Sequence, residues 1–262
     1  MRHDKALILV GVVLLLGFSS KWAQGASVGL AQEKQGWDAS VEYTALLNQD
    51  IKDQTSVKNH EIDQSSAVLA KVNYAFNENY SLYAKLGMAD LETQLTVVSA
   101  GADRAPYKLE YDFGFAWGIG GKASYAIGES GLRVIGDLQY LQWDSSLSSL
   151  TVNGTKPGSI SASDVTVSDF SLSGILAKEW GSFTPYLGVK LSKVIVDYGS
   201  VNHAGVTIGS TTFTGFTGDA ESENNIGVIT GAEYKVTDNF SLNVEGRFID
   251  ETAITGGAVY RF

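Results

Sequence analysis

Hydrophobic and polar residues alternate along most of this chain. In the segment YSLYAKLGM, Leu82, Leu86 and Met88 occupy one set of alternate positions, and Lys85 belongs to the other set. The segment FSLNVEGRF at 240–248 repeats the pattern. Successive side chains of a strand point to opposite faces, whereas a helix repeats every 3.6 residues. The alternation therefore predicts β-strands, each with one apolar and one polar face.

Segments with this alternation recur along the whole chain. They lie at 37–45, 66–76, 80–89, 112–127, 132–143, 167–179, 183–196, 224–236, 240–249 and 252–262. An even number of strands of this kind is typical of a transmembrane barrel. The pattern predicts an all-β fold, a transmembrane antiparallel β-barrel of about ten strands, with eight strands as the nearest alternative.

The links between these segments alternate in length. Short links lie at 77–79, 128–131, 181–182, 237–239 and 250–251, and long ones at 46–65, 90–111, 144–166 and 197–223. Outer-membrane barrels have short periplasmic turns and longer extracellular loops. With both chain ends in the periplasm, ten strands would place every long link outside the cell.

Aromatic residues strengthen the membrane prediction. The segment DFGFAWGIGGKASY sets Phe113, Phe115 and Trp117 against a face that contains Gly118 and Gly120. A soluble monomer rarely exposes so much apolar surface, whereas lipid suits it. Further aromatic residues lie beside the short links, where a belt at the membrane interface is expected; they are Tyr74, Phe76, Tyr80, Tyr125, Trp180, Phe183, Tyr234, Phe240, Tyr260 and Phe262.

The first residues have the features of a secretory signal. A basic start, MRHDK, precedes the apolar run 6–18 and the small residues of AQG. The run is shorter than the ~20 residues that a transmembrane helix needs, so we expect a signal peptide rather than an anchor. The sequence predicts a signal peptide at 1–25, with cleavage after Gly25, and a single barrel domain at 26–262.

The amino-acid composition excludes several classes of site and partner. The chain has no cysteine, which excludes a disulfide scaffold and a thiolate metal site. It has 19 Lys and Arg against 29 Asp and Glu, a formal net charge of −10, which argues against a nucleic-acid partner.

The end of the chain supports a family resemblance. The signal peptide, the alternating strands and the final AVYRF together resemble the small, porin-like outer-membrane β-barrel proteins of Gram-negative bacteria. The resemblance implies residence in the outer membrane, contact with its lipids, and recognition of the closing strand by the barrel assembly machinery. It assigns that signal to Tyr260 and Phe262.

The polar faces of the strands should line the lumen. Acids and bases are balanced there, which suggests paired charges because an unpaired buried charge is costly. Two interpretations stay open: a structural ionic network with water, or a narrow pathway for ions or small solutes. The lumen residues expected to matter most are Glu42, Lys71, Lys85, Lys122, Arg133, Asp137, Lys190, Glu233, Glu245 and Arg247; Asp112 is also expected to point inward.

No catalytic constellation is evident. Ten-stranded outer-membrane proteases resemble this chain in strand count, but the Asp-x-His that they need is missing, because Val201 and Asn202 precede His203. His60 and His203 are expected to be solvated residues of outer loops, and no GxSxG motif occurs. We expect no enzyme activity, no cofactor and no metal site; the acidic segment 218–225 lacks calcium-loop spacing.

Two functions remain for such a barrel. One is a structural or porin-like protein with a narrow channel, which would depend on the lumen charges. The other is a surface protein that binds an extracellular ligand, not identified by the sequence, through its long loops.

Overall fold

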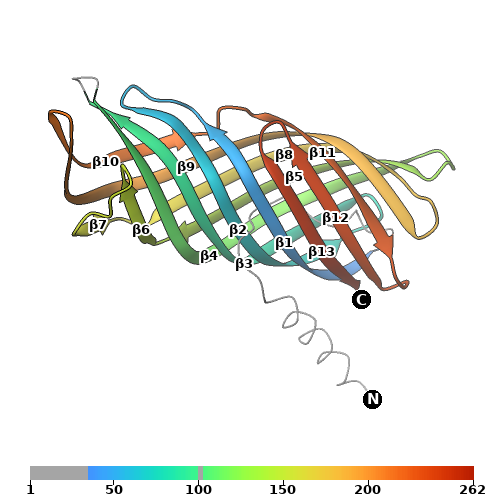
Figure 1. Ribbon diagram of the computed structural model, residues 1–262. Helices are drawn as coiled ribbons and strands as arrows, with labels where there is room; N and C mark the ends of the chain where they lie inside the picture. The colour runs from blue at the N-terminus through green and yellow to red at the C-terminus, as the bar shows by residue number, and fades with distance from the viewer. Residues whose placement is uncertain (1–34, 100–102) are drawn as a thin grey trace, which may run out of the picture.

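The strands of the protein form a closed antiparallel ring (Figure 1). This computed structural model describes residues 35–99 and 103–262. The ring contains, in order, β1 (Gly36–Ile51), β2 (Val57–Ala75), β3 (Tyr80–Val98), β4 (Arg104–Ile127), β5 (Leu132–Ser145), β8 (Val165–Lys178), β9 (Phe183–Ile208), β11 (Ile226–Lys235), β12 (Phe240–Phe248) and β13 (Thr252–Arg261), which pairs with β1. The predicted ten-stranded barrel is confirmed.

Three further strands extend the wall at one end. They are β6 (Leu147–Val152), which pairs with β4, β7 (Ile160–Ala162), which pairs with β9, and β10 (Thr211–Glu221), which forms a hairpin with β9. Figure 1 shows them at the end opposite the C-terminus. The predicted signal peptide lies outside the described residues. Within 35–99 and 103–262, no helix is long and apolar enough to cross a membrane.

The two faces of the wall differ as the alternation predicts. On β3, Leu82 and Leu86 are each 57% exposed, whereas Lys85 between them is buried inside the ring. On β12, Leu242 and Val244 are exposed, and Arg247 is buried. Apolar side chains on the outside and charged ones on the inside are the arrangement of a barrel in lipid.

Apart from the turn at 250–251, the short turns lie at the end of the barrel where β1 begins and β13 ends. The aromatic rings there contact one another: Tyr74 lies 4.6 Å from Trp37 between ring centroids, and Tyr260 lies 5.2 Å from Phe262. The amide of Phe262 donates to the carbonyl of Trp37 over 3.0 Å, which joins the two terminal strands. These rings form the expected interfacial belt, to which Trp37 is an addition.

Most described residues of the four long links lie in strands rather than in loops. β1 and β2 stay paired from Gly36↔Ala75 up to Ile51↔His60, and β3 and β4 up to Val98↔Arg104. Most residues expected in outer loops therefore continue the strands beyond the apolar outer surface. The alternation weakens there because water, rather than lipid, bathes the outer face, so that face also becomes polar.

β10 completes the outer part of the wall. One edge of β10 pairs with β9, and its end reaches β1 through the bridge Ile51↔Ser222. The amide of Lys52 donates to the carbonyl of Glu221 over 2.8 Å. The turn between β12 and β13 lies nearer the periplasmic end of the barrel than this contact. In the outer half of the wall, β10 therefore takes the place of β12 and β13 beside β1.

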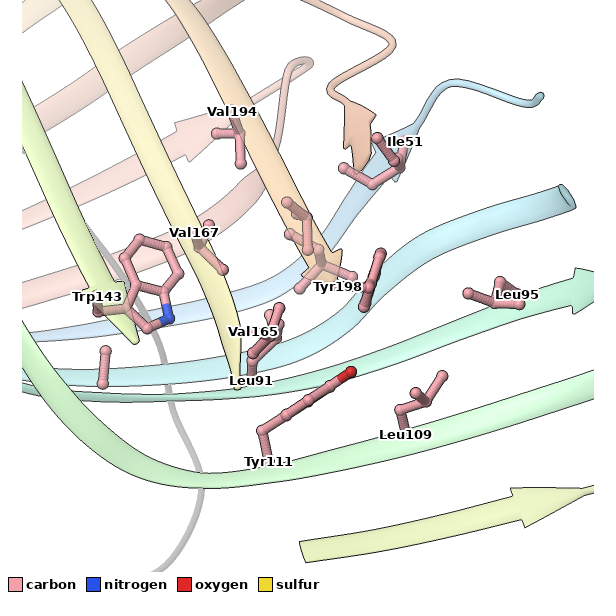
Figure 2. Close-up of a cluster of buried hydrophobic side chains, with 14 of the residues drawn as sticks. Ile51, Leu91, Leu95, Leu109, Tyr111, Trp143, Val165, Val167, Val194 and Tyr198 are labelled. Atoms are coloured by element: carbon pink, nitrogen blue, oxygen red, sulfur yellow. The ribbon is translucent and has the colours of Figure 1, made fainter. Parts of the chain in front are cut away.

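The outer half of the lumen holds a hydrophobic cluster, here called the outer core. It gathers side chains from the facing walls, as Figure 2 shows for Ile51, Leu91, Leu109, Tyr111, Trp143, Val165 and Tyr198. Trp143 and Leu109 are fully buried. The expectation of a polar lumen therefore holds for the half nearer the periplasmic turns, whereas the outer half is apolar.

Candidate functional site

The charged half of the lumen contains two ion-pair clusters, and the first joins β1, β2 and β3. Lys71 and Lys85 are directly opposite each other in the register of β2 and β3. Glu42 on β1 binds both: its Oε1 lies 2.9 Å from Lys71 Nζ and its Oε2 lies 2.7 Å from Lys85 Nζ. Two like charges directly opposite would be destabilising. The single carboxylate therefore offsets the repulsion between the two ammonium groups.

Tyr83 extends this cluster along the inner wall to β5. Its ring centroid lies 5.4 Å from Lys71 Nζ and 5.6 Å from Lys85 Nζ, within cation–π range. Its hydroxyl donates to Asp137 Oδ1 on β5 over 2.8 Å. The ring passes over Gly120, where an added Cβ would come within 2.3 Å of it. The inward glycines of β4 thus make room for side chains that reach across from β3.

Lys122 also belongs to this part of the lumen. It is the register partner of Asp137 on the neighbouring strand, and both side chains are buried. A basic and an acidic residue directly opposite each other attract.

The second cluster is centred on Arg247 of β12. Its Nε donates to Glu251 Oε1 over 2.7 Å, and its Nη1 donates to Thr255 over 2.9 Å and lies 3.3 Å from Glu245 Oε1. Tyr186 of β9 donates its hydroxyl to Glu245 over 3.0 Å. Arg247 is fully buried, so these acceptors replace its water shell.

Lys190 of β9 joins the same cluster from the opposite side. Its Nζ lies 3.1 Å from Asp250 Oδ2 and also pairs with Glu251. Asp250 and Glu251 were expected in a short turn, but both are buried. The turn folds into the lumen, and Gly227 allows this: a Cβ there would lie 1.9 Å from Asp250 Oδ1. These two carboxylates were not expected inside the lumen, because acidic residues in turns are usually solvated.

Two further pairs lie toward the periplasmic turns. Arg261 donates to Glu233 over 2.5 Å, and Arg133 lies 3.6 Å from Glu179. All ten lumen residues singled out in the sequence therefore lie on the inner wall; Arg133 is half-buried and the other nine are buried.

Asp112 was expected inside and is exposed. The pairing of β3 with β4 shifts register between Ala89 and Leu91, and that of β4 with β6 shifts between Glu110 and Tyr111. Such an irregularity turns the following residues relative to the sheet. Asp112 and Phe113 both face outward as a result, so the inward expectation for Asp112 was wrong.

The two histidines were expected in solvated loops, and this expectation was also wrong. Both lie buried in the outer core, His60 on β2 and His203 on β9. His60 Nε2 is 2.7 Å from the hydroxyl of Tyr198, and His203 Nε2 is 2.9 Å from that of Tyr107. Burial lowers the pKa of His60 to about 4, which keeps its ring neutral at pH 7. These contacts tie β9 to the facing strands β2 and β4.

A polar contact closes the rim above the outer core. Asp103, immediately before β4, accepts hydrogen bonds from Thr211 Oγ1 over 2.7 Å and from the amide and hydroxyl of Ser210 over 3.2 Å and 3.1 Å. These hydrogen bonds lower the pKa of Asp103. The tips of the β3–β4 and β9–β10 hairpins are thereby joined.

The acidic segment 218–225 is partly engaged in the wall. Glu221 lies 2.7 Å from Lys193 Nζ and 3.5 Å from Lys52 Nζ. Ser222 is buried and donates to Asn225 over 2.8 Å. This part of the segment is therefore fixed by the wall, although most of it lies in the long link 197–223 that was expected outside the cell.

Comparison with known proteins finds one matching family. The model described as "Opacity family porin protein" matches residues 123–257, which is half of the chain. No curated protein matches the sequence.

Several solved structures are similar in shape. The translocator domain of the autotransporter NalP from Neisseria meningitidis shares 12% identity, with 98% of this chain and 95% of that chain covered and a TM-score of 0.46. The outer membrane protein OprG from Pseudomonas aeruginosa shares 14% identity, with 89% and 99% covered and a TM-score of 0.40. The outer membrane protease OmpT from Escherichia coli shares 10% identity, with 87% and 94% covered and a TM-score of 0.46.

Proposed function

The chain belongs to the Opacity family of porin proteins, and from this premise we propose a porin-like barrel whose narrow polar lumen is closed at its outer end by the outer core. It is an integral β-barrel protein of the outer membrane. The observation that carries the proposal is the change of lining along the lumen: paired charges in the membrane-embedded half, and buried apolar side chains above them.

The ion pairs alone do not form an open path. Lys85, Glu42 and Arg247 are each buried to within 2% of full burial, and each contacts an opposite charge. A permeating ion would have to exchange with these partners, as in a pore lined by rings of charge. In a ten-stranded barrel such a path is narrow, because open aqueous channels occur in much larger rings.

The outer core acts as the closure in this proposal. Apolar constrictions stop ions because the ions would lose their water there. Two ring contacts join the β9–β10 hairpin to the facing wall: Tyr198 of β9 with His60 of β2, and His203 of β9 with Tyr107 of β4. Movement of this hairpin would connect the polar lumen with the outside.

Planar-bilayer conductance tests the proposal on residues 26–262, refolded from denaturant. We expect rare openings of the unaltered protein and frequent discrete openings of the double variant Tyr107→Ala/Tyr198→Ala. The double variant Tyr43→Ala/Tyr234→Ala, which removes two tyrosines from the exposed outer wall, should behave like the unaltered protein. Heat-modifiable gel mobility establishes that each variant is folded.

The same conductance recording tests whether ions pass through the charged lumen. Adding Lys85→Gln to the open variant removes a positive charge from the lumen and should raise the selectivity for cations; Arg133→Gln should do the same nearer the periplasm. A folded Tyr107→Ala/Tyr198→Ala protein that remains silent would overturn the channel, and unchanged selectivity would place conduction elsewhere.

A second function is favoured by the outer strand extensions. The hairpins beyond the membrane are paired strands held at their tips by Asp103, so they present a fixed surface. Rigid surfaces bind with a smaller loss of conformational entropy than mobile loops. Binding of whole cells or of extracellular proteins to vesicles that display the protein, with and without Asp103→Ala, would test this role.

We further propose that the protein is not an enzyme, that residues 1–25 are removed as a signal peptide, and that Tyr260 and Phe262 are recognised by the barrel assembly machinery. The neutral His60 inside an apolar cluster supports the first statement, since a general base needs access to substrate. The exposure of Phe262, 76%, at the end of the closing strand supports the last.

A further inference from the structure

The outer wall of the barrel has a groove that faces the lipid. It has a volume of about 400 Å³ and lies between β5, β8 and β9, lined by Val134, Gly174, Leu176, Leu187, Gly188 and Val189. Most of these side chains belong to the apolar face that surrounds the ring, so the groove lies within the membrane-spanning part of the wall.

Gly174, which lines the groove, lies beside a second outward glycine on the neighbouring strand, so two side chains are missing from this part of the wall. Gly136 on β5 and Gly174 on β8 are register partners, and Gly174 is also opposite Val189 on β9. A Cβ on Gly136 would meet nothing within 4 Å, and one on Gly174 only a methyl of Val189 at 4.0 Å. Exposed Val134, Leu176 and Leu187 rise beside this gap. A gap between such ridges suits a single hydrocarbon chain.

A cation lies at the periplasmic end of the groove. Every second residue of β8 faces outward, so Leu172, Gly174, Leu176 and Lys178 form one column along the wall. Trp180, 61% exposed, follows at the height of the interfacial aromatic belt. Long cationic side chains at this depth place their apolar stem along the wall and their charge at the lipid headgroups.

Lys178 is available to an anion at that position. Its ammonium donates to the carbonyl of Ser130, a neutral acceptor. Glu179, the neighbouring carboxylate, pairs with Arg133 on the inner side of the wall. The charge of Lys178 is therefore directed to the headgroup layer rather than to the lumen.

We propose that this groove binds one anionic phospholipid of the periplasmic leaflet, with an acyl chain against Gly136 and Gly174 and the net negative headgroup at Lys178. The occupant follows from the site: an apolar groove in the membrane ends at a positive charge at headgroup depth, and an acyl chain linked to a net negative headgroup has the complementary arrangement. The proposal concerns the outside of the wall and does not depend on conduction through the lumen.

Native mass spectrometry of the refolded protein would test the proposal, with equimolar phosphatidylglycerol and phosphatidylethanolamine added in detergent. We expect one bound phosphatidylglycerol to persist after detergent removal. Gly174→Leu should fill the groove and reduce that bound fraction at least fivefold. Lys178→Gln should keep lipid binding but abolish the preference for phosphatidylglycerol over phosphatidylethanolamine.

Gly256→Leu is the matched control. Gly256 lies on the outward face of β13, where a Cβ would also meet nothing within 4 Å, and it is away from the groove. This variant should retain the lipid of the unaltered protein. Equal lipid retention by the Gly174 and Gly256 variants would overturn the site, and unchanged headgroup preference in Lys178→Gln would overturn the role of that residue. A dimer that is lost with Gly174→Leu would show that a second copy occupies the groove, which also overturns the proposal.

Discussion

His60 on β2 is hydrogen-bonded to Tyr198 on β9, 138 residues away in sequence, and the two rings lie 5.5 Å apart inside the outer core. The contact joins opposite walls of the lumen at the height where its lining becomes apolar. It also places a titratable ring where no water can solvate its charge.

The stability of the outer core should depend on pH through His60. Burial lowers its folded-state pKa to about 4, although nearby Asp53 opposes the shift, whereas the unfolded value is ~6.5. The unfolded chain thus binds the proton first. The free energy of unfolding should be unaffected by this group above about pH 7 and should fall by about 3 kcal/mol as the pH decreases from ~6.5 to ~4.

Guanidinium unfolding followed by tryptophan fluorescence at several pH values measures this dependence. His60→Gln cannot titrate and keeps a polar group near Tyr198, so its curve should lack the additional loss in this pH window. An identical slope for both proteins would contradict the assignment to His60.

Glu42 should be indispensable to the first ion-pair cluster. Glu42→Gln removes the carboxylate from between Lys71 and Lys85, leaving two buried like charges opposite each other. We expect a loss of about 3–5 kcal/mol in unfolding free energy. Glu110→Gln, which changes an exposed pair with Lys108, should change it by less than about 0.5 kcal/mol. Similar losses in the two variants would contradict the role given to burial.

Gly120 should tolerate no side chain. The Cβ of Gly120→Ala would lie 2.3 Å from the ring of Tyr83, so the ring must move and its bond to Asp137 must break. Overpacking of this kind costs about 1–3 kcal/mol. Gly256→Ala has open space around it and serves as the control in the same unfolding experiment. Equal stability of the two variants would show that Tyr83 can move at little cost.

Phe262 should affect assembly into the outer membrane of cells more than refolding in detergent. Deletion of Phe262 removes one exposed ring and one hydrogen bond to Trp37, so refolding in detergent should be nearly unchanged. If the assembly machinery reads this ring, the amount in the outer membrane should fall severalfold. Fractionation of cells and heat-modifiable mobility measure the two quantities; a parallel loss in both would instead indicate a structural role.

The ten spanning strands could be predicted because lipid imposes a strict rule on them. Leu82 and Leu86 must face hydrocarbon, and Lys85 must then face the lumen, so the alternation is unambiguous. The same rule located all ten lumen residues singled out in the sequence on the inner wall.

The outer half could not be predicted in this way, because its partners are distant in sequence and its outer face meets water. Nothing near His203 indicates that Tyr107 will contact it. Nothing in the turn at 250–251 indicates that Asp250 and Glu251 will pair with Lys190 inside the lumen. The register shifts near Asp112 likewise depend on how long neighbouring strands fit together.

The contact of β10 with β1 has a geometric consequence. The diameter of a closed sheet grows with its number of strands, and β10 replaces β11, β12 and β13 beside β1 above the bridge Ile51↔Ser222. The ring is therefore tapered: it is wider where it crosses the membrane and narrower where it emerges. The narrow end has room only for side chains, so the protein closes its outer opening by reducing the circumference of its wall, without a separate plug domain.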